Sequence, residues 1–548
     1  MNTTLKIRFL TGILLFVLIV SATVVKAQKN YFFYIQFADK NNSPYSLSNP
    51  SAYLTVRAIA RRTAFGIACD STDLPVNPAY VQQIQNMGIS VHNRSKWMNG
   101  VTVMLQDSSK MNQVRALSFV KFVEYTGLLN GPALAPPSKV RAFTSHDYGI
   151  AATQINQLNG IGLHNQGFRG KGIEIGVIDA GFTNVDTNHA FDSLRLQGRL
   201  LGTKDIINPS SNIFTEDAHG ANVLSIMTGN FPGQFLGTAP EASFWLIRTE
   251  YGPTENKFET DFWCSGIEFA DSVGIDVATS SLGYSTFDDS SMSFTYADMN
   301  GKVSRASRAA NIASKKGIVV LVAAGNEGSS AWHYILSPAD ADGIIAVGAV
   351  TSAGNPSSFT SFGPSYDGRV KPEICAMGTS TAIVNTNGTP TTGNGTSYAT
   401  PAMAGMVACL LQYYKTQNST PNVQVFLNSL FRTGNLFNNP TTQMGYGIPD
   451  FAQAELNLTT INYLIPVEKN KFELLVNPTF KTLIVRYTVG NVPQNTSLKI
   501  YSITGELLIN MPVSDSTTVL RTNRFVPGIY AVCITENGVN QTQKIIIR

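Results

Sequence analysis

The stretch IEIGVI at Ile173–Ile178 is a short, continuous apolar run, which is typical of a strand buried on both faces of a sheet. Similar runs recur along the chain and alternate with stretches of helical periodicity. The other apolar runs are Phe244–Ile247, Ile275–Thr279, Ile318–Ala323 and Ile344–Val350, and the helical stretches are Val223–Met227, Val303–Lys316 and Tyr398–Tyr414. This alternation predicts an α/β fold with a parallel sheet that is covered on both faces.

This α/β block, residues 146–458, lies between two segments of different pattern. Residues 28–126 alternate short β-like runs with amphipathic stretches such as Tyr80–Met87, which predicts a small α+β domain. Residues 127–145 hold three Pro and two Gly and are interpreted as a linker. After the α/β block the pattern becomes purely β, which predicts a small antiparallel β-sandwich over residues 465–548.

Composition excludes several classes of protein. Charged residues make up only 14% of the 548 residues, and 45 residues are Gly, which argues against a coiled coil or a disordered chain. The net charge is +4 and no basic stripe occurs, so a nucleic-acid partner is not expected. The five Cys are too few and too scattered for a disulfide scaffold or a metal motif, and no bridge is assigned among Cys69, Cys264, Cys375, Cys409 and Cys533.

The first 27 residues indicate export. Lys6 and Arg8 precede the apolar run Phe9–Val20, and small residues follow it up to Ala27. This order is typical of a secretory signal peptide that is cut after Ala27. The alternative, an anchoring helix, needs about 20 apolar residues, more than this run has. We therefore expect a secreted or cell-surface protein without a stable transmembrane anchor.

Four residues with reactive side chains stand at the ends of expected strands or at the starts of expected helices. Asp179 follows Ile173–Ile178, His219 precedes a helical run, Asn326 follows a buried strand, and Ser397 opens another helix. In open parallel sheets, reactive groups collect at the carboxyl ends of strands. Each residue alone could be a turn, cap or core residue. Together they supply a carboxylate, a base, an amide donor and a hydroxyl nucleophile, each close to a Gly.

With these segments the α/β block resembles the subtilisin-like (S8 family) serine peptidases. Supporting motifs are Gly237-Thr238-Ala239-Pro240, Ser281-Leu282-Gly283, Val347-Gly348-Ala349-Val350, Lys371-Pro372-Glu373 and Gly445-Tyr446-Gly447. The resemblance implies a catalytic triad of Asp179, His219 and Ser397 that works through an acyl-enzyme, with Asn326 as an oxyanion donor. Ala180 and Ala221 stand where the family commonly has Ser or Thr, but neither change removes a reacting group.

The resemblance also implies where the substrate binds. The family lines the pocket for the residue before the scissile bond with the segments that are here Ser280, Ser281, Leu282 and Gly283, and Ala323, Ala324 and Gly325. Because these side chains are small and uncharged, we expect a preference for apolar or large uncharged residues. The chemistry requires no cofactor. Acidic pairs such as Asp288-Asp289 could hold structural calcium, but such pairs are common on surfaces and no metal site is predicted.

The segment before the α/β block resembles the prosegment of secreted subtilisin-like enzymes. The matching pieces are Tyr34-Ile35-Gln36-Phe37, Arg57-Ala58, Arg61-Arg62, Leu74-Pro75-Val76 and Ser95-Lys96-Trp97-Met98-Asn99. The resemblance implies a zymogen that is cut between Thr126 and Asp147. The alternative is an ordinary domain that the mature enzyme keeps.

The segment after the α/β block, residues 465–548, is similar to the C-terminal sorting domain of the type IX secretion system. The matching pieces are Val476-Asn477-Pro478, Ile500-Tyr501-Ser502-Ile503-Thr504-Gly505, Pro527-Gly528-Ile529-Tyr530 and Lys544-Ile545-Ile546. The similarity implies passage through the periplasm and recognition by the type IX machinery. The alternative is a β-sandwich that binds substrate or carbohydrate.

Three functions are compatible with these features. The first is a secreted serine endopeptidase that cleaves proteins or peptides with broad specificity. The second is a surface binding or adhesion protein on an inactive peptidase scaffold, and the third is a narrow peptidase that processes other exported proteins. The intact set of Asp179, His219, Asn326 and Ser397 favours an active enzyme over an inactive scaffold.

Overall fold

The computed structural model describes two compact units of the chain, within residues 1–459 and 460–548. The described residues are 29–130, 148–418, 421–464 and 472–547, the last without 478–481, 488–491, 493–495, 503–504, 516, 524 and 537–538. The expected signal peptide and most of the expected linker lie outside these residues. Within them, no helix combines the length and the apolar character needed to cross a membrane.

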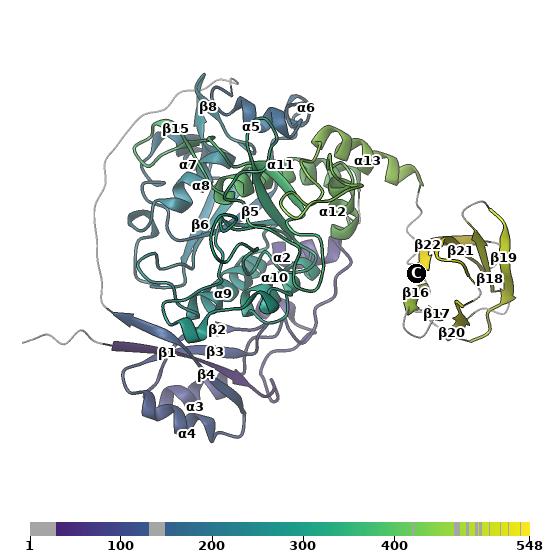
Figure 1. Ribbon diagram of the computed structural model, residues 1–548. Coiled ribbons are helices and arrows are strands. Elements are labelled where there is room, and N and C mark those ends of the chain that lie inside the picture. Colours follow the sequence, from purple (N-terminus) through teal and green to yellow (C-terminus); the bar gives the residue numbers. More distant parts are fainter. Residues whose placement is uncertain are drawn as a thin grey trace, which may run out of the picture. The chain divides into compact units, whose positions relative to one another are not determined.

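A seven-stranded sheet forms the centre of the first unit, with the strand order β13-β12-β11-β10-β5-β9-β6 (Figure 1). All of its neighbouring strands run parallel, as the sequence predicts. Its strands are β5 (Glu174–Asp179), β6 (Leu200–Asp205), β9 (Ser243–Arg248), β10 (Val277–Ser280), β11 (Val319–Ala323), β12 (Ile345–Val350) and β13 (Ile374–Met377).

Helices cover both faces of this sheet because its strands are apolar on both sides. Ile175 and Val177 of β5 pack in one core with helices α8 (His219–Thr228) and α11 (Thr396–Gln417). Ile178 of the same strand packs in a second core with α9 (Phe258–Val273) and α10 (Arg305–Lys315). The predicted α/β architecture is confirmed.

Two strands of this sheet are not predicted from the sequence. β6 is an edge strand, partly exposed along most of its length, and its sequence LLGTKD includes a Gly, a Thr and a Lys. β13 has only four residues and follows Pro372 and Glu373. Neither strand therefore gives a long apolar run.

The N-terminal α+β domain packs on the helices α9 and α10 through one face of its own sheet. This antiparallel sheet has the order β2-β3-β1-β4. One face packs on α3 (Pro78–Asn86) and α4 (Met111–Arg115). On the other face Phe32 and Tyr34, together with Trp97 of the turn between β2 and β3, join the core around α9. The strands are β1 (Lys29–Phe37), β2 (Ser90–Ser95), β3 (Gly100–Leu105) and β4 (Val120–Asn130).

The start of the expected linker belongs to a strand. β4 continues through Gly127 to Asn130, because the first residues of β1 offer backbone partners and Lys29 pairs with Asn130. The boundary expected at residue 126 therefore does not coincide with the end of this strand.

Buried charges join the N-terminal domain to α9. The carboxylate of Asp271 is fully buried and accepts hydrogen bonds from Arg61 (2.6 Å), Arg62 (2.9 Å) and Lys96 (3.0 Å). Burial opposes ionisation of Asp271, but the three cations outweigh it and lower the pKa of Asp271 far below its usual value. The domain is thus bound by a buried charge network whose cations come from the N-terminal domain and whose carboxylate comes from α9.

The remaining elements of the first unit are short or peripheral. The helices are α2 (Val56–Ala64), α5 (Ala152–Gln157), α6 (Ile161–Asn165), α7 (Asp192–Leu196), α12 (Val423–Phe431) and α13 (Phe451–Leu464), and short strand pairs are β7 (Asn230–Phe231) with β8 (Phe235–Leu236) and β14 (Thr381–Val384) with β15 (Pro390–Gly393). Single 3₁₀ turns lie at Pro50–Ala52, Ser108–Lys110, His189–Phe191, Ile213–Thr215, Ser290–Met292 and Tyr296–Asp298.

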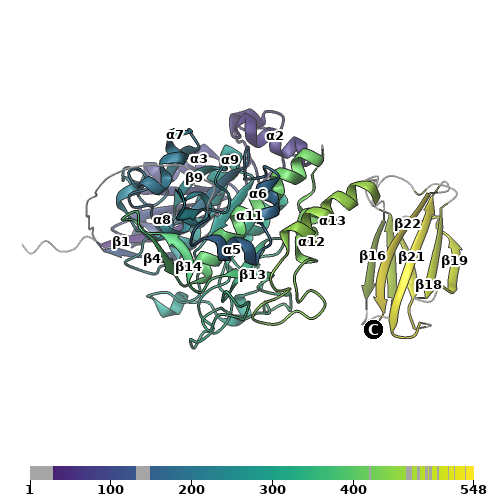
Figure 2. The same cartoon turned by 90° about the horizontal axis from the view of Figure 1, so that it is seen from above.

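The C-terminal unit consists of two antiparallel sheets (Figure 2). Their strand orders are β16-β17-β20 and β19-β18-β21-β22. Its core includes Leu483 and Val485 from one sheet and Leu498, Ile500 and Val532 from the other, as expected for a sandwich. β19 is not among the strands predicted from the sequence, and its adjacent Leu507 and Leu508 are both exposed. The strands are β16 (Phe472–Asn477), β17 (Thr482–Tyr487), β18 (Ser497–Ser502), β19 (Leu507–Pro512), β20 (Thr517–Arg521), β21 (Gly528–Glu536) and β22 (Val539–Ile547).

Candidate active site

The carboxyl ends of the central strands border a cleft of about 340 Å³ in the first unit. His219, Asn326 and Ser397 line this cleft. Asp179 ends β5 and lies buried behind His219. The fold therefore brings together four residues that are far apart in the sequence.

The acid and the base of this set are hydrogen-bonded. Nδ1 of His219 lies 2.7 Å from Oδ1 of Asp179, and the same oxygen accepts the backbone N–H of Ala180 at 2.8 Å. The helix that carries His219 can approach β5 this closely because the next residue is Gly220. A Cβ at that position would lie 2.4 Å from the carbonyl oxygen of Gly181 and 2.9 Å from Cβ of Asp179.

The environment of His219 favours its charged form. The ring is 31% exposed, and its burial opposes protonation, but the negative charge and the hydrogen bond of Asp179 outweigh that cost. Asp217 and Glu250 add to the effect, and together these groups raise the pKa of His219 to about 9. An imidazolium at this position is therefore strongly stabilised.

Ser397 lies in the first turn of α11, a helix of 22 residues that begins at Thr396. Its hydroxyl donates to the carbonyl oxygen of Ser281 at 3.3 Å, and the Ser281 hydroxyl donates to the carbonyl oxygen of Ser397 at 2.9 Å. The ring of Tyr398, the next residue, stacks against His219 at 6.1 Å between centroids. The start of α11 thus lies beside the imidazole, although the Ser397 hydroxyl is turned to Ser281.

The side-chain amide of Asn326 is fixed by the start of the same helix. Its Oδ1 accepts the backbone N–H of Thr396 at 2.8 Å and the Thr396 hydroxyl at 3.0 Å. Because the oxygen is turned to Thr396 and Asn326 lines the cleft, the NH₂ group is available to a group bound there. The amide is oriented before any substrate arrives.

Only some of the residues expected in the substrate pocket line the cleft. Ser281, Leu282, Gly283, Ala323 and Gly325 line the cleft, but Ser280 and Ala324 do not. The hydroxyl of Ser280 accepts a hydrogen bond from the indole of Trp263 at 2.9 Å, because alternate side chains of a strand face opposite ways. The side chain of Ala324 is completely buried.

Several residues that line the cleft were not identified from the sequence: Ala180, Asp217, Glu250, Glu327, Leu336 and Thr396. Glu250 follows the end of β9, so the rule of strand ends could have found it. Leu336 lies in an irregular segment between β11 and β12, and no sequence pattern marks it.

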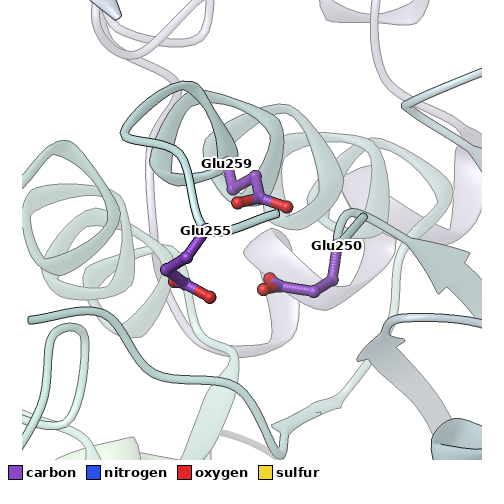
Figure 3. Close-up of side chains that lie close together, drawn as sticks. All are labelled: Glu250, Glu255 and Glu259. Atoms are coloured by element: carbon purple, nitrogen blue, oxygen red, sulfur yellow. The ribbon is translucent and has the colours of Figure 1, made fainter. Parts of the chain in front are cut away.

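Glu250 also belongs to a group of three carboxylates. Glu250, Glu255 and Glu259 each place one oxygen within 4.8 Å of the other two, and Figure 3 shows their carboxylates directed toward one another. Burial and the neighbouring charge of Asp288 raise the pKa of Glu255 to about 7. Among the described residues this is the one group of three or more acidic, His or Cys side chains close enough to share a cation, and carboxylates are ligands that Ca²⁺ prefers.

Comparisons with known proteins identify each part of the chain. The model of the Subtilase family matches residues 170–447. The chain belongs to the subtilase family. In this subtilase, the Bacteroidota propeptide domain of peptidase S8 matches residues 32–141, and the secretion system C-terminal sorting domain matches residues 477–548. The family and both flanking modules inferred from the sequence are confirmed.

The subtilase is also similar to individual proteins and to a solved structure. The subtilase is 29% identical over 335 residues to Subtilisin NAT of Bacillus subtilis subsp. natto, an alignment that covers 61% of this chain and 76% of that protein. It is 31% identical over 264 residues to Subtilisin of Bacillus pumilus, with 48% and 85% covered. Among solved structures, the prenylagaramide maturation protease PagA matches with 22% identity and a TM-score of 0.44, with 55% and 98% covered.

These matches assign the general activity and destination. The subtilase is a serine endopeptidase that carries an N-terminal propeptide. Its sorting domain marks it as a secreted or cell-surface protein and implies export by the type IX system.

Proposed function

We propose that the subtilase cleaves peptide bonds with Asp179, His219 and Ser397 as its catalytic triad. The observation that carries this proposal is the 2.7 Å hydrogen bond between the buried Asp179 and His219, in the cleft that also holds Ser397. His219 uses Nδ1 for Asp179, which leaves Nε2 for the serine hydroxyl. The hydroxyl must turn from Ser281 toward Nε2 when substrate binds, and catalytic hydrogen bonds often align only in the substrate complex.

In the proposed reaction, His219 accepts one proton in each nucleophilic attack and gives it to the leaving group. Oγ of Ser397 attacks the carbonyl carbon of the substrate while Nε2 of His219 takes the hydroxyl proton. The tetrahedral intermediate then expels the amine, which receives that proton, and leaves an acyl-enzyme. Water attacks the acyl group by the same route and restores the serine. Asp179 stabilises the imidazolium in both steps, in agreement with the raised pKa of His219.

Two donors serve the negative oxygen of the intermediate. One is the NH₂ group of Asn326, and the other is the backbone N–H of Ser397 in the first turn of α11. At a helix start the backbone N–H groups lack partners within the helix, and the helix dipole favours a negative charge there. Donors that are already oriented stabilise the transition state without reorganising.

The substrates we propose are proteins or peptides with an uncharged residue before the scissile bond. Leu282, Gly283, Ala323 and Gly325 line the cleft with small or apolar groups. The bond-breaking steps use groups of this chain alone and need no cofactor. A chelator is expected to leave the rate of reaction of Ser397 unchanged in enzyme that remains folded.

The N-terminal domain is proposed to leave the enzyme after cleavage between Thr126 and Asp147. A buried charge network between this domain and α9 suits a propeptide, which must fold with the enzyme and then be released. Sequencing the N-terminus of the active enzyme tests this step. An N-terminus at residue 28 would contradict it.

Hydrolysis of a protein substrate such as casein tests the proposed activity. The wild type is expected to cleave it, and Ser397→Ala is expected to lose more than about 10³-fold in kcat. Ser352→Ala, which changes an exposed serine of the same unit, is the matched control and should behave as the wild type. Full activity of Ser397→Ala would refute the triad, and an inactive wild type would favour the binding-protein alternative.

A further inference from the structure

Leu336 lies between the two segments that border the substrate cleft. It is half-buried and lines the cleft together with Gly283 and Gly325. A Cβ on Gly283 would lie 2.7 Å from Cδ1 of Leu336, and a Cβ on Gly325 would lie 2.7 Å from its Cγ. The isobutyl group is therefore in van der Waals contact with the backbone of both glycines, and it occupies the space between them.

The backbone of Leu336 is held in place from both sides. Its N–H donates to the carbonyl oxygen of Ala324 at 3.1 Å, next to Gly325. The following residue, Ser337, exchanges two backbone hydrogen bonds with Tyr284, next to Gly283, at 2.7 and 3.0 Å. These hydrogen bonds fix the backbone of Leu336 beside both glycines, so its side chain starts from a fixed point in the wall of the cleft.

We infer that Leu336 determines the size of the side chain accepted before the scissile bond and restricts it to small residues such as Ala and Ser. This inference rests on the proposed function, because it assigns the space beside Ser397 to that substrate residue. The expectation from the sequence considered only residues 280–283 and 323–325 of the pocket, and it included large uncharged side chains of the substrate. The position of Leu336 narrows that expectation to small side chains of the substrate. A large side chain would have to share the space that Leu336 fills, and forcing extra groups into a packed site is costly.

Two peptides that differ only in having Ala or Phe before the scissile bond test this inference. The wild type is expected to cleave the Ala peptide with a kcat/KM about 10-fold or more above that of the Phe peptide. Leu336→Ala opens the space between the two glycines. It is expected to raise kcat/KM for the Phe peptide about 10- to 100-fold, with a much smaller change for the Ala peptide.

Matched variants and a separate probe of Ser397 make the test decisive. Leu336→Met conserves volume and should keep the preference for Ala, and Leu336→Val should give an intermediate shift if Leu336→Ala folds poorly. Labelling with a fluorophosphonate reports the reactivity of Ser397 independently of pocket size. A wild type that is not labelled would therefore contradict the proposed function and not the role of Leu336. The inference is overturned if the labelled wild type cleaves both peptides equally, or if labelled Leu336→Ala and Leu336→Val keep the wild-type ratio.

Discussion

Nδ1 of His219 lies 2.7 Å from Oδ1 of Asp179, and this contact joins the core of the subtilase to its cleft. Asp179 is completely buried at the end of β5, whereas about a third of the His219 side chain is exposed at the start of α8. The carboxylate can therefore hold the ring in one orientation while the opposite nitrogen remains available to substrate chemistry.

Replacing the carboxylate of Asp179 should reduce catalysis without unfolding the enzyme. In Asp179→Asn the amide can stabilise the wrong tautomer of His219 and cannot balance the imidazolium. We expect kcat to fall by about 10⁴-fold, with a smaller effect on KM. Steady-state kinetics on a peptide substrate measure both, and Asp186→Asn, at an exposed carboxylate, should match the wild type. A loss below about 10-fold would contradict the role of Asp179.

The raised pKa of His219 sets the direction of the pH dependence. A general base must be neutral, and the pKa of about 9 keeps the ring protonated at lower pH. The value of kcat/KM should therefore rise with pH and reach half its maximum near pH 9. In Asp179→Asn the midpoint should move down toward the ordinary value of about 6.5. The same midpoint in both proteins would show that another group controls the profile.

Removing the amide of Asn326 should affect the transition state more than substrate binding. Asn326→Ala is expected to lower kcat by about 10²- to 10³-fold, the effect known for an oxyanion-hole donor in subtilisin, a relative of this chain. KM should change little because the developing oxyanion exists only after attack. Thr396→Ser, which keeps the hydroxyl that binds Asn326, is the control. A large rise in KM with unchanged kcat would argue that Asn326 binds the ground state.

The buried charge network of the propeptide domain should contribute strongly to the stability of the precursor. Asp271→Ala leaves Arg61, Arg62 and Lys96 without their common partner, and removing one member of a buried ion pair costs about 3–5 kcal/mol. Urea unfolding of the precursor, made with Ser397→Ala to prevent processing, measures this cost. The exposed Asp186→Asn again serves as the control. An unchanged unfolding midpoint would mean that the network adds nothing to docking.

Deletion of residues 465–548 should change where the protein is exported and leave the reactivity of its catalytic unit unchanged. The C-terminal unit has its own core, and the sorting-domain match lies within it. We expect the truncated protein to accumulate in the periplasm with Ser397 still reactive toward a fluorophosphonate. Cell fractionation followed by labelling measures both. Normal export of the truncated protein would contradict the sorting role.

Most of the proposed site can be predicted from the sequence because its reacting groups lie at the ends of strands and at the starts of helices. Asp179 directly follows an apolar run, and His219 and Ser397 are next to a Gly or close to one, so residue type and position agree. The strand period of two separates Ser281, which lines the cleft, from Ser280, which bonds to Trp263. That period could have been applied to the sequence.

Other features depend on tertiary contacts that no local pattern encodes. Leu336 enters the cleft because backbone hydrogen bonds fix its segment against residues 283–284 and 324–325. The carboxylates of Glu250, Glu255 and Glu259 meet because the chain folds back between β9 and α9. The extension of β4 likewise depends on the position at which β1 begins. These contacts could be identified only from the structure.

The most direct test of the account is covalent labelling of the purified enzyme with a fluorophosphonate, followed by mass analysis of its peptides. If His219 activates Ser397, the wild type should take up one label, on the peptide that contains Ser397, and Ser397→Ala should take up none. Labelling that persists in Ser397→Ala, or a folded wild type that remains unlabelled at pH 9, would contradict the proposed triad.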